Sequence, residues 1–180
     1  MKKELINTDS QVEHFILEQN GNFPNNKLPL LIYKKAIDFT QQKKHAAKTA
    51  EEIFEKNNWG NTWENGIYDF HHYHSTTHES LAVVVGSAQV ILGGPGGRKV
   101  EIKAGDVIII PAGVGHKCLS ASEDFVCVGG YPEGKDYDIK RGKESELPDA
   151  LKHIHEVPLP ATDPVYGKQK LIISYWEKRP

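Results

Sequence analysis

The spacing of His72 and His74 constrains the structure of this chain more than any other feature of its sequence. Side chains two residues apart on an extended strand point to the same face, so these two imidazoles can bind a single ion. Tyr73 and His71 then point to the opposite face of the strand. We therefore expect His72 and His74 to be metal ligands and His71 to lie outside the site.

A carboxylate opens the next predicted strand, Glu79–Val85. Alternation along this strand places Glu79 on the same face as Leu81 and Val83, which is the apolar face expected to point inward. A buried carboxylate without a partner is costly, and a metal ion is one of the few partners that offset this cost. Glu79 is therefore the third expected ligand, with His78 in the preceding turn as an alternative ligand or a supporting residue.

The fourth expected ligand comes from a later part of the chain. Val107–Ile110 is predicted to be a strand, and it ends at Pro111 because proline cannot donate to a sheet ladder. The chain resumes at His116, which we expect to lie across the fold from His72 and His74. Three imidazoles and one carboxylate suit a divalent first-row metal, and they do not choose among Mn, Fe, Ni, Co and Zn.

These residues resemble the two sequence motifs of the cupin superfamily, G(X)5HXH(X)3–4E(X)6G and G(X)5PXG(X)2H(X)3N. The matching residues are Gly66, His72, His74, Glu79, Gly86, Gly105, Pro111, Gly113 and His116. The final asparagine of the second motif is replaced by Ser120, which we expect at a turn and not at the metal site. The chain is most similar to the uncharacterised single-domain bacterial cupins. The resemblance implies an all-β fold, a double-stranded β-helix or jelly-roll barrel, and the four metal ligands named above.

The length of 180 residues suits one domain that can bury a core without disulfides. We divide it into an N-terminal arm and helix (1–65), a metal-binding barrel core (66–130), and a wrapping segment with a terminal strand (131–180). Apolar residues at helical spacing predict one helix over Thr40–Asn58, packed outside the barrel. Lys170–Trp176 is predicted to be the terminal strand and to pair into the barrel.

Other segments are assigned from their apolar and turn residues. Further strands are predicted at Val12–Gln19, Leu31–Tyr33, Gln89–Leu92, Val100–Ile102, Phe125–Val128 and His153–Val157. Tyr131–Lys152 is polar, and we expect an excursion over the surface or the barrel mouth whose charges form a solvated face. His153 and His155 lack the glycine frame of either motif, so no second metal site is expected. Trp59 and Trp63 are expected to pack in the core or a lid.

The composition limits the partners of the protein. Its formal net charge of −2 leaves no basic surface for nucleic acid, and no apolar run approaches the roughly twenty residues of a membrane span. We expect a cytoplasmic protein that binds a small molecule. Cys118 and Cys127, in adjacent predicted strands, are then expected to be reduced core thiols. The arm Val12–Tyr33 is rich in strand formers, so we expect it to be exchanged or to extend a sheet in a homodimer.

Two classes of function fit a metal site with an open coordination position. The first is a divalent-metal-dependent enzyme, an oxygenase or an isomerase or lyase, acting on a small oxygen-bearing metabolite. The second is a non-catalytic binding or sensing module, in which the metal orients a ligand or stabilises the barrel. The sequence does not assign the catalytic acid or base, although Tyr68, Asp69 and Tyr73 lie near the first motif.

Overall fold

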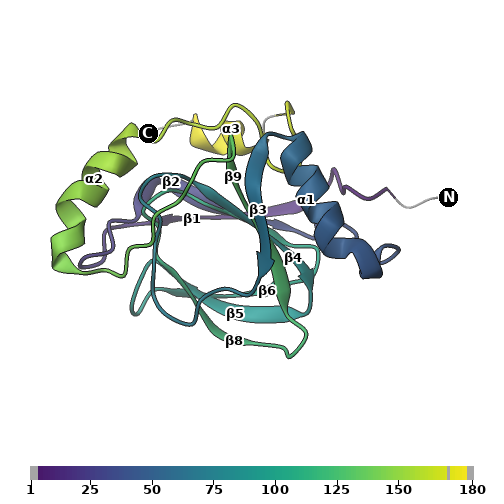
Figure 1. Cartoon of the computed structure of the whole chain (residues 1–180), viewed down its shortest axis with the longest axis horizontal. Coiled ribbons are helices and arrows are strands. Elements are labelled where there is room, and N and C mark those ends of the chain that lie inside the picture. Colours follow the sequence, from purple (N-terminus) through teal and green to yellow (C-terminus); the bar gives the residue numbers. More distant parts are fainter. Residues whose placement is uncertain (1–3, 170, 178–180) are drawn as a thin grey trace.

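The computed structural model describes residues 4–169 and 171–177, and the strands in this part of the chain form two antiparallel sheets. One sheet has six strands in the order β1–β2–β7–β4–β9–β3, and the other has three in the order β6–β5–β8. Figure 1 shows the smaller sheet facing the larger one, with helices beside the larger sheet. The antiparallel pairing throughout agrees with the predicted all-β fold.

Most predicted strands are found, and two have the predicted bounds. The strands are β1 (Gln11–Leu17), β2 (Asn26–Lys34), β3 (Trp59–Asn65), β4 (Glu79–Val85), β5 (Ser87–Leu92), β6 (Arg98–Lys103), β7 (Val107–Ile110), β8 (His116–Ala121) and β9 (Val126–Pro132). The α-helices within the described residues are α1 (Ala46–Lys56), α2 (Leu147–Glu156) and α3 (Leu171–Trp176), and short 3-10 helices at Lys43–His45 and Glu144–Glu146 precede α1 and α2. The bounds of β4 and β7 match the prediction, whereas β2 is longer than predicted because it takes in part of the segment before Leu31.

The six-stranded sheet is buried on both faces along its inner strands β2, β4 and β7. Its inner face packs against the three-stranded sheet and includes Ile32, Leu81, Val83, Ile108 and Ile110. Its outer face packs under the helices and includes Leu31, Tyr33, Ala82, Val84 and Ile109. Alternate residues of each strand therefore lie in two separate cores. This double burial explains why these strands are continuous apolar runs and do not alternate between apolar and polar residues.

The predicted helix Thr40–Asn58 is confirmed as α1, in a shorter form. Its buried residues, among them Ala50, Ile53 and Phe54, pack on the outer face of the six-stranded sheet, so the expected position outside the sheets is also confirmed. The helix ends before Asn58, whose φ of 61° lies in the left-handed region that often terminates a helix.

The prediction of a C-terminal strand is wrong. Residues 171–176 form α3, and Lys170 lies outside the described residues. Ile172, Ile173 and Trp176 are buried against the outer core, and the Trp176 Nε1 donates a hydrogen bond to the Pro29 carbonyl of β2 at 2.9 Å. A short apolar run does not distinguish a strand from a buried helical turn. Here the apolar outer face of the six-stranded sheet is buried by the apolar side chains of a helix.

The predictions for the preceding segment also need correction. The brief strand predicted at His153–Val157 is wrong, because residues 153–156 belong to α2 and Val157 is its C-cap. The helix has Pro148 in its first turn, where a proline is tolerated. Ala150 and Ile154 of α2 pack against Phe23 and Tyr73. The structure therefore has α2 and α3 in addition to the one predicted helix.

The prediction that Cys118 and Cys127 lie in adjacent strands is wrong. Cys118 lies in β8 and Cys127 in β9, which belong to different sheets and are not adjacent strands. Neither forms a disulfide; Cys127 is buried in the inner core, whereas Cys118 is only partly buried against it. No helix of the described chain has the length and apolarity that crossing a bilayer requires.

A buried carboxylate, Asp163, ties the C-terminal segment to the six-stranded sheet. It accepts hydrogen bonds from the Tyr33 hydroxyl at 2.7 Å and from the backbone N–H groups of Val165, Tyr166 and Ile172 at 2.8, 2.9 and 3.0 Å. Its side chain is buried. A single side chain thus connects β2 to the first turn of α3.

Replacing Asp163 with Ala should lower the free energy of unfolding by about 2–4 kcal/mol, because a buried hydroxyl and several N–H groups lose their acceptor. Tyr33→Phe removes one of the four bonds and should cost only about 1 kcal/mol. Urea titration followed by circular dichroism measures both variants. A cost below about 0.5 kcal/mol for Asp163→Ala would contradict this role, since that is the range of ordinary surface substitutions.

Candidate metal centre

His72 and His74 lie in the loop between β3 and β4, which is extended but is not a regular strand. His72 pairs with His116, the first residue of β8, through N–H to carbonyl bonds of 3.2 and 2.9 Å. On the opposite face of this loop, His71 and Tyr73 pack against the Phe23 ring at centroid distances of 5.8 and 5.7 Å. The predicted faces are therefore confirmed, although isolated bridges replace the predicted strand.

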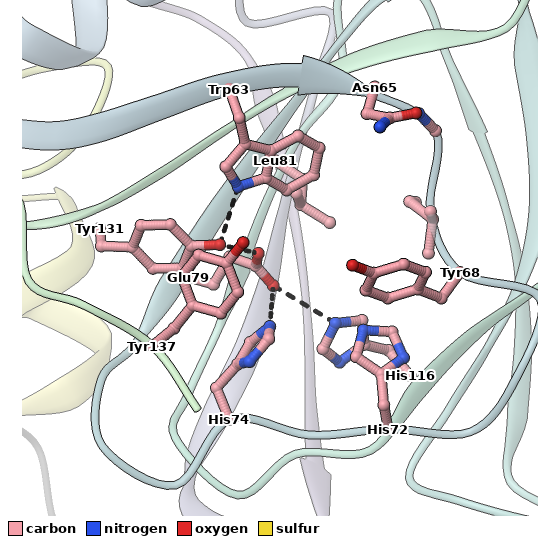
Figure 2. A pocket seen from close by; sticks show the side chains of 12 residues that line it. Trp63, Asn65, Tyr68, His72, His74, Glu79, Leu81, His116, Tyr131 and Tyr137 are labelled. Carbon is pink, nitrogen blue, oxygen red and sulfur yellow. Dashed lines mark hydrogen bonds and ion pairs between the residues drawn. The ribbon is translucent and has the colours of Figure 1, made fainter. Parts of the chain in front are cut away.

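Among the described residues, His72, His74 and His116 form a buried cluster that can hold a metal ion. One ring nitrogen of each lies within 4.8 Å of those of the other two. The ring centroids of His72 and His116 are 4.0 Å apart, and His74 lies 5.6 Å from each. Figure 2 shows the three rings converging on one side of a pocket. We call these residues the histidine cluster.

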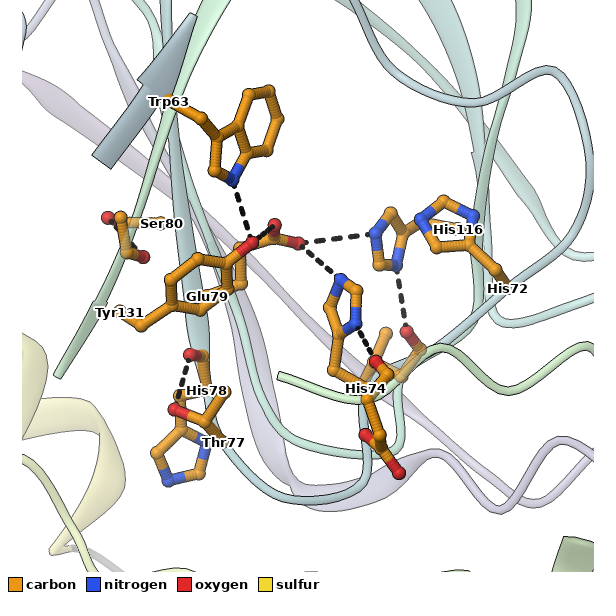
Figure 3. Close-up of polar contacts among 12 residues, drawn as sticks. Trp63, His72, His74, Thr77, His78, Glu79, Ser80, His116 and Tyr131 are labelled. Carbon is orange, nitrogen blue, oxygen red and sulfur yellow. Dashed lines mark hydrogen bonds and ion pairs between the residues drawn. The ribbon is translucent and has the colours of Figure 1, made fainter. Parts of the chain in front are cut away.

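The backbone fixes which ring nitrogen of each histidine faces the site. The Nδ1 atoms of His72, His74 and His116 lie at hydrogen-bond distance from the carbonyl oxygens of Phe70, Asp138 and Val114, respectively. A carbonyl only accepts, so each Nδ1 carries the proton and each Nε2 keeps its lone pair for the site. Metal-binding histidines are commonly oriented by such a hydrogen bond. Figure 3 shows some of these contacts around the cluster.

Glu79, the first residue of β4, places its carboxylate beside the cluster. Its Oε2 lies 3.4 Å from His74 Nε2 and 3.3 Å from His116 Nε2, yet this oxygen is buried and has no hydrogen-bond donor. Two ligands about 2.1 Å from one ion, at angles between octahedral and tetrahedral, are separated by ~3.0–3.4 Å. The donor atoms therefore fit a shared metal ion.

The other oxygen of Glu79 is held by a chain of two hydrogen bonds. Tyr131 donates its hydroxyl proton to Glu79 Oε1 at 2.9 Å, and Trp63 donates its Nε1–H to the Tyr131 oxygen at 2.8 Å (Figures 2 and 3). The Trp63 indole lies against Gly129, where a Cβ would come within 2.2 Å of the ring. The absence of a side chain at Gly129 thus lets Trp63 reach Tyr131.

Burial and mutual interactions shift the pKa values of these groups. Burial raises the pKa of Glu79, but the neighbouring His74 and His116 outweigh it, so its pKa lies below the usual range. Burial and the nearby His116 lower the pKa of His72 to about 3. Burial opposes protonation of His74, but Glu79 outweighs burial and raises its pKa. The site therefore favours an ionised carboxylate, which is the form that binds cations.

The cluster lies at the wall of a cavity of about 260 Å³. The cavity is lined by Trp63, Asn65, Gly66, Ile67, Tyr68, His72, His74, Glu79, Leu81, His116, Tyr131 and Tyr137. Tyr68 and Tyr137 are the exposed aromatic residues of this lining, at 46% and 37% exposure, and mark its mouth. Trp59 is buried in the outer core as predicted, whereas Trp63 lines the cavity.

The other histidines lie outside the site. His78 is buried, accepts a hydrogen bond from the Ala112 N–H at its Nδ1, and packs against Trp176 at a centroid distance of 4.7 Å. It is therefore not part of the cluster. His153 and His155 lie on α2, with the His153 Nδ1 at 3.1 Å from the Ser75 hydroxyl.

The segment after β9 contributes to the site in ways that its sequence did not predict. Asp138 accepts hydrogen bonds from the backbone and the hydroxyl of Ser75, while its carbonyl orients His74. Tyr137 packs its ring edge-on against His74 at 5.0 Å. These residues belong to the segment predicted to be an excursion over the surface or the barrel mouth, and no sequence signal set them apart as parts of the site. The expectation that all its charges are solvated is wrong at Asp138.

The acid–base candidates near the first motif fall in different places. Tyr68 lines the cavity, Tyr73 is buried on the opposite face of the loop, and Asp69 is exposed and is not among the lining residues. Ser120 lies in β8 and not at the turn expected for it.

Comparison with known proteins identifies the family. A family model described as cupin domain matches residues 63–128. Uncharacterized protein YjlB of Bacillus subtilis (strain 168) is 38% identical over 171 residues, which cover 94% of this chain and 99% of that protein. The chain therefore belongs to the cupin family.

Two solved structures are distantly similar to this chain. The QdtA 3,4-ketoisomerase from Thermoanaerobacterium thermosaccharolyticum is 20% identical, with 51% of this chain and 70% of that chain covered and a TM-score of 0.39. Acireductone dioxygenase from Bacillus anthracis, with a cadmium ion in its active centre, is 14% identical, with 67% and 76% covered and a TM-score of 0.37. Similarity at this level carries no argument about the reaction.

Replacing His116 with Ala should weaken metal binding by more than about 100-fold, because even residues that only support a metal ligand contribute 10- to 100-fold. His71→Ala is the matched control, since its ring lies on the opposite face of the same loop, and it should change affinity by less than about twofold. Elemental analysis after dialysis measures both. Equal metal content in the His116→Ala and His71→Ala variants would refute the cluster as a metal site.

Proposed function

We propose that this cupin is a divalent-metal-dependent enzyme, an oxygenase or an isomerase or lyase, that acts on a small oxygen-bearing metabolite inside a jelly-roll barrel. The observation that carries this proposal is the position of the histidine cluster and Glu79 at the wall of a cavity. A structural metal needs no cavity beside it. A catalytic one needs an open position that a small molecule can reach.

The donor set supports a four-ligand site made of the histidine cluster and Glu79. The three Nε2 atoms are aimed by backbone carbonyls, and Glu79 Oε2 is a buried oxygen without a donor. A divalent ion held there would polarise an oxygen of the substrate or, if it is redox-active, activate dioxygen. The nitrogen and oxygen donors suit Mn, Fe, Ni, Co or Zn alike.

The chain's own residues orient the site and restrict its size. Tyr131 holds one carboxylate oxygen of Glu79, so that the other points to the histidine cluster. Burial and the nearby Glu79 raise the pKa of Tyr131, which keeps its phenol protonated as a hydrogen-bond donor. The cavity of about 260 Å³ is smaller than the ~300–1,000 Å³ of sites for drug-sized ligands. It therefore suits a small metabolite.

The alternative is a non-catalytic module that binds a small molecule through the same metal. The same cavity and donor set would serve that role, so the two functions differ only in turnover. We favour the enzyme because all four expected donor residues, the histidine cluster and Glu79, line a cavity that a small molecule can enter.

Protein purified without added metal should contain one divalent first-row ion per chain, and metal-dependent turnover should appear within a panel of small acids, sugars and phenols. Dioxygen uptake and mass spectrometry of products distinguish an oxygenase from an isomerase or lyase. The Glu79→Gln variant should bind the metal more weakly than the wild type, because a neutral amide is a poorer ligand than a carboxylate. It should still retain part of the metal, since the amide oxygen can coordinate. Metal-loaded protein that binds panel members without converting any of them would favour the binding module, and protein that binds no metal would refute both.

We also infer a cytoplasmic homodimer assembled through β1. This strand lies at the edge of the six-stranded sheet, and Ile16 on it is 62% exposed. An edge strand that carries exposed apolar residues is prone to pair with another copy. Light scattering at micromolar concentration should give twice the chain mass of 20.2 kDa, and Ile16→Lys should shift it toward the monomer. A monomeric mass for the wild-type chain would contradict the proposal.

A further inference from the structure

Two tyrosines at the mouth of the cavity direct their hydroxyl groups inward. Tyr68 comes from the loop after β3, and Tyr137 comes from the loop after β9. Figure 2 shows their hydroxyl ends pointing into the cavity from opposite sides, above the histidine cluster. A phenol hydroxyl both donates and accepts a hydrogen bond. A molecule bound in the cavity can therefore exchange hydrogen bonds with both groups.

Both rings are held in place although they are partly exposed. Tyr68 stacks on Phe70 at 4.7 Å and meets the His72 ring edge-on at 5.1 Å. Tyr137 stacks on Tyr131 at 4.6 Å, with 22° between the ring planes. Tyr137 also meets the His74 ring, as described above. Each hydroxyl is thus oriented before a ligand arrives, which lowers the entropy cost of binding.

Within the part of the chain that the structure describes, neither lysine nor arginine is among the lining residues of the cavity. The basic residues nearest in sequence to Tyr137 each interact with another side chain. Lys135 pairs with Glu133 at 3.8 Å, Lys140 pairs with Asp138 at 3.8 Å, and the Arg141 guanidinium lies over the Phe70 ring at 3.6 Å. A phosphate group inside the cavity would lose its water without gaining a lysine or arginine as partner, which is costly.

We propose that Tyr68 and Tyr137 select the substrate by hydrogen-bonding hydroxyl or carbonyl groups at its end remote from the histidine cluster, and that the site excludes phosphorylated compounds. The substrate class is a small, unphosphorylated hydroxy- or keto-compound. This inference rests on the proposed function, because it takes the histidine cluster as the end where a metal binds the substrate.

The test uses pairs of small molecules that differ only in a phosphate group. The probes are dihydroxyacetone with its phosphate, and glycerate with 3-phosphoglycerate. Calorimetry on metal-loaded, full-length protein should give at least about tenfold tighter binding for the unphosphorylated member of a pair, since the phosphate is left without a cation. Metal content is measured on the same sample.

Three variants locate the selectivity in the two tyrosines. Tyr68→Phe and Tyr137→Phe should each weaken binding of the unphosphorylated probe by roughly three- to tenfold, the effect of one lost hydrogen bond, and leave metal content unchanged. Tyr137→Lys should tighten binding of the phosphorylated probes relative to the wild type, because it adds the missing cation. Tyr175→Phe, on α3 and outside the cavity lining, is the control and should change nothing.

The outcomes separate this inference from the proposed function. A sample that takes up no metal defeats the proposed function. In a metal-loaded sample, three results overturn only the selection by Tyr68 and Tyr137: equal or tighter binding of the phosphorylated probes, binding of no probe, or unchanged binding in both Phe variants.

Discussion

The carboxylate of Glu79 is buried between the two sheets, and its two oxygens have different neighbours. One accepts a hydrogen bond from Tyr131, and the other faces the Nε2 atoms of His74 and His116 without a donor of its own. A buried negative charge is tolerated only where it is compensated. The buried charge of Glu79 is therefore the constraint on which the site depends, because the nearby rings and loops must compensate it.

The position of Glu79 depends in turn on the double burial of the six-stranded sheet. β4 lies between β7 and β9 and is buried along most of its length, so its register is strongly specified. A shift by one residue would turn Glu79 toward the helices and Ser80 toward the cavity. The outer core under α1 and α3 thus holds the carboxylate in place, although none of its residues lines the cavity.

The site also spans the two sheets. Glu79 belongs to the larger sheet, while His116 belongs to β8 of the smaller sheet and pairs with the loop that carries His72. The separation of the donor atoms is consequently set by how the sheets pack. The segment after β9 then crosses to this loop, where Asp138 orients His74 and Tyr137 covers the cavity.

The sequence by itself determined the features that depend only on neighbouring residues, which are the positions of the central strands and the direction of their side chains. Alternation along β4 and around His72 and His74 depends only on the period of an extended chain, and it predicted which side chains share a face. The tertiary structure alone decided three features. They are the helical fold of the C-terminal segment, the hydrogen bonds by which Tyr131 and Asp138 support the site, and the packing of His78 outside the site. Each depends on contacts between residues far apart in the chain, such as Trp176 with Pro29 or Trp63 with Tyr131. A local apolar or polar pattern carries no record of such contacts, because the same run can form a strand, a helix or a loop depending on the surface it covers.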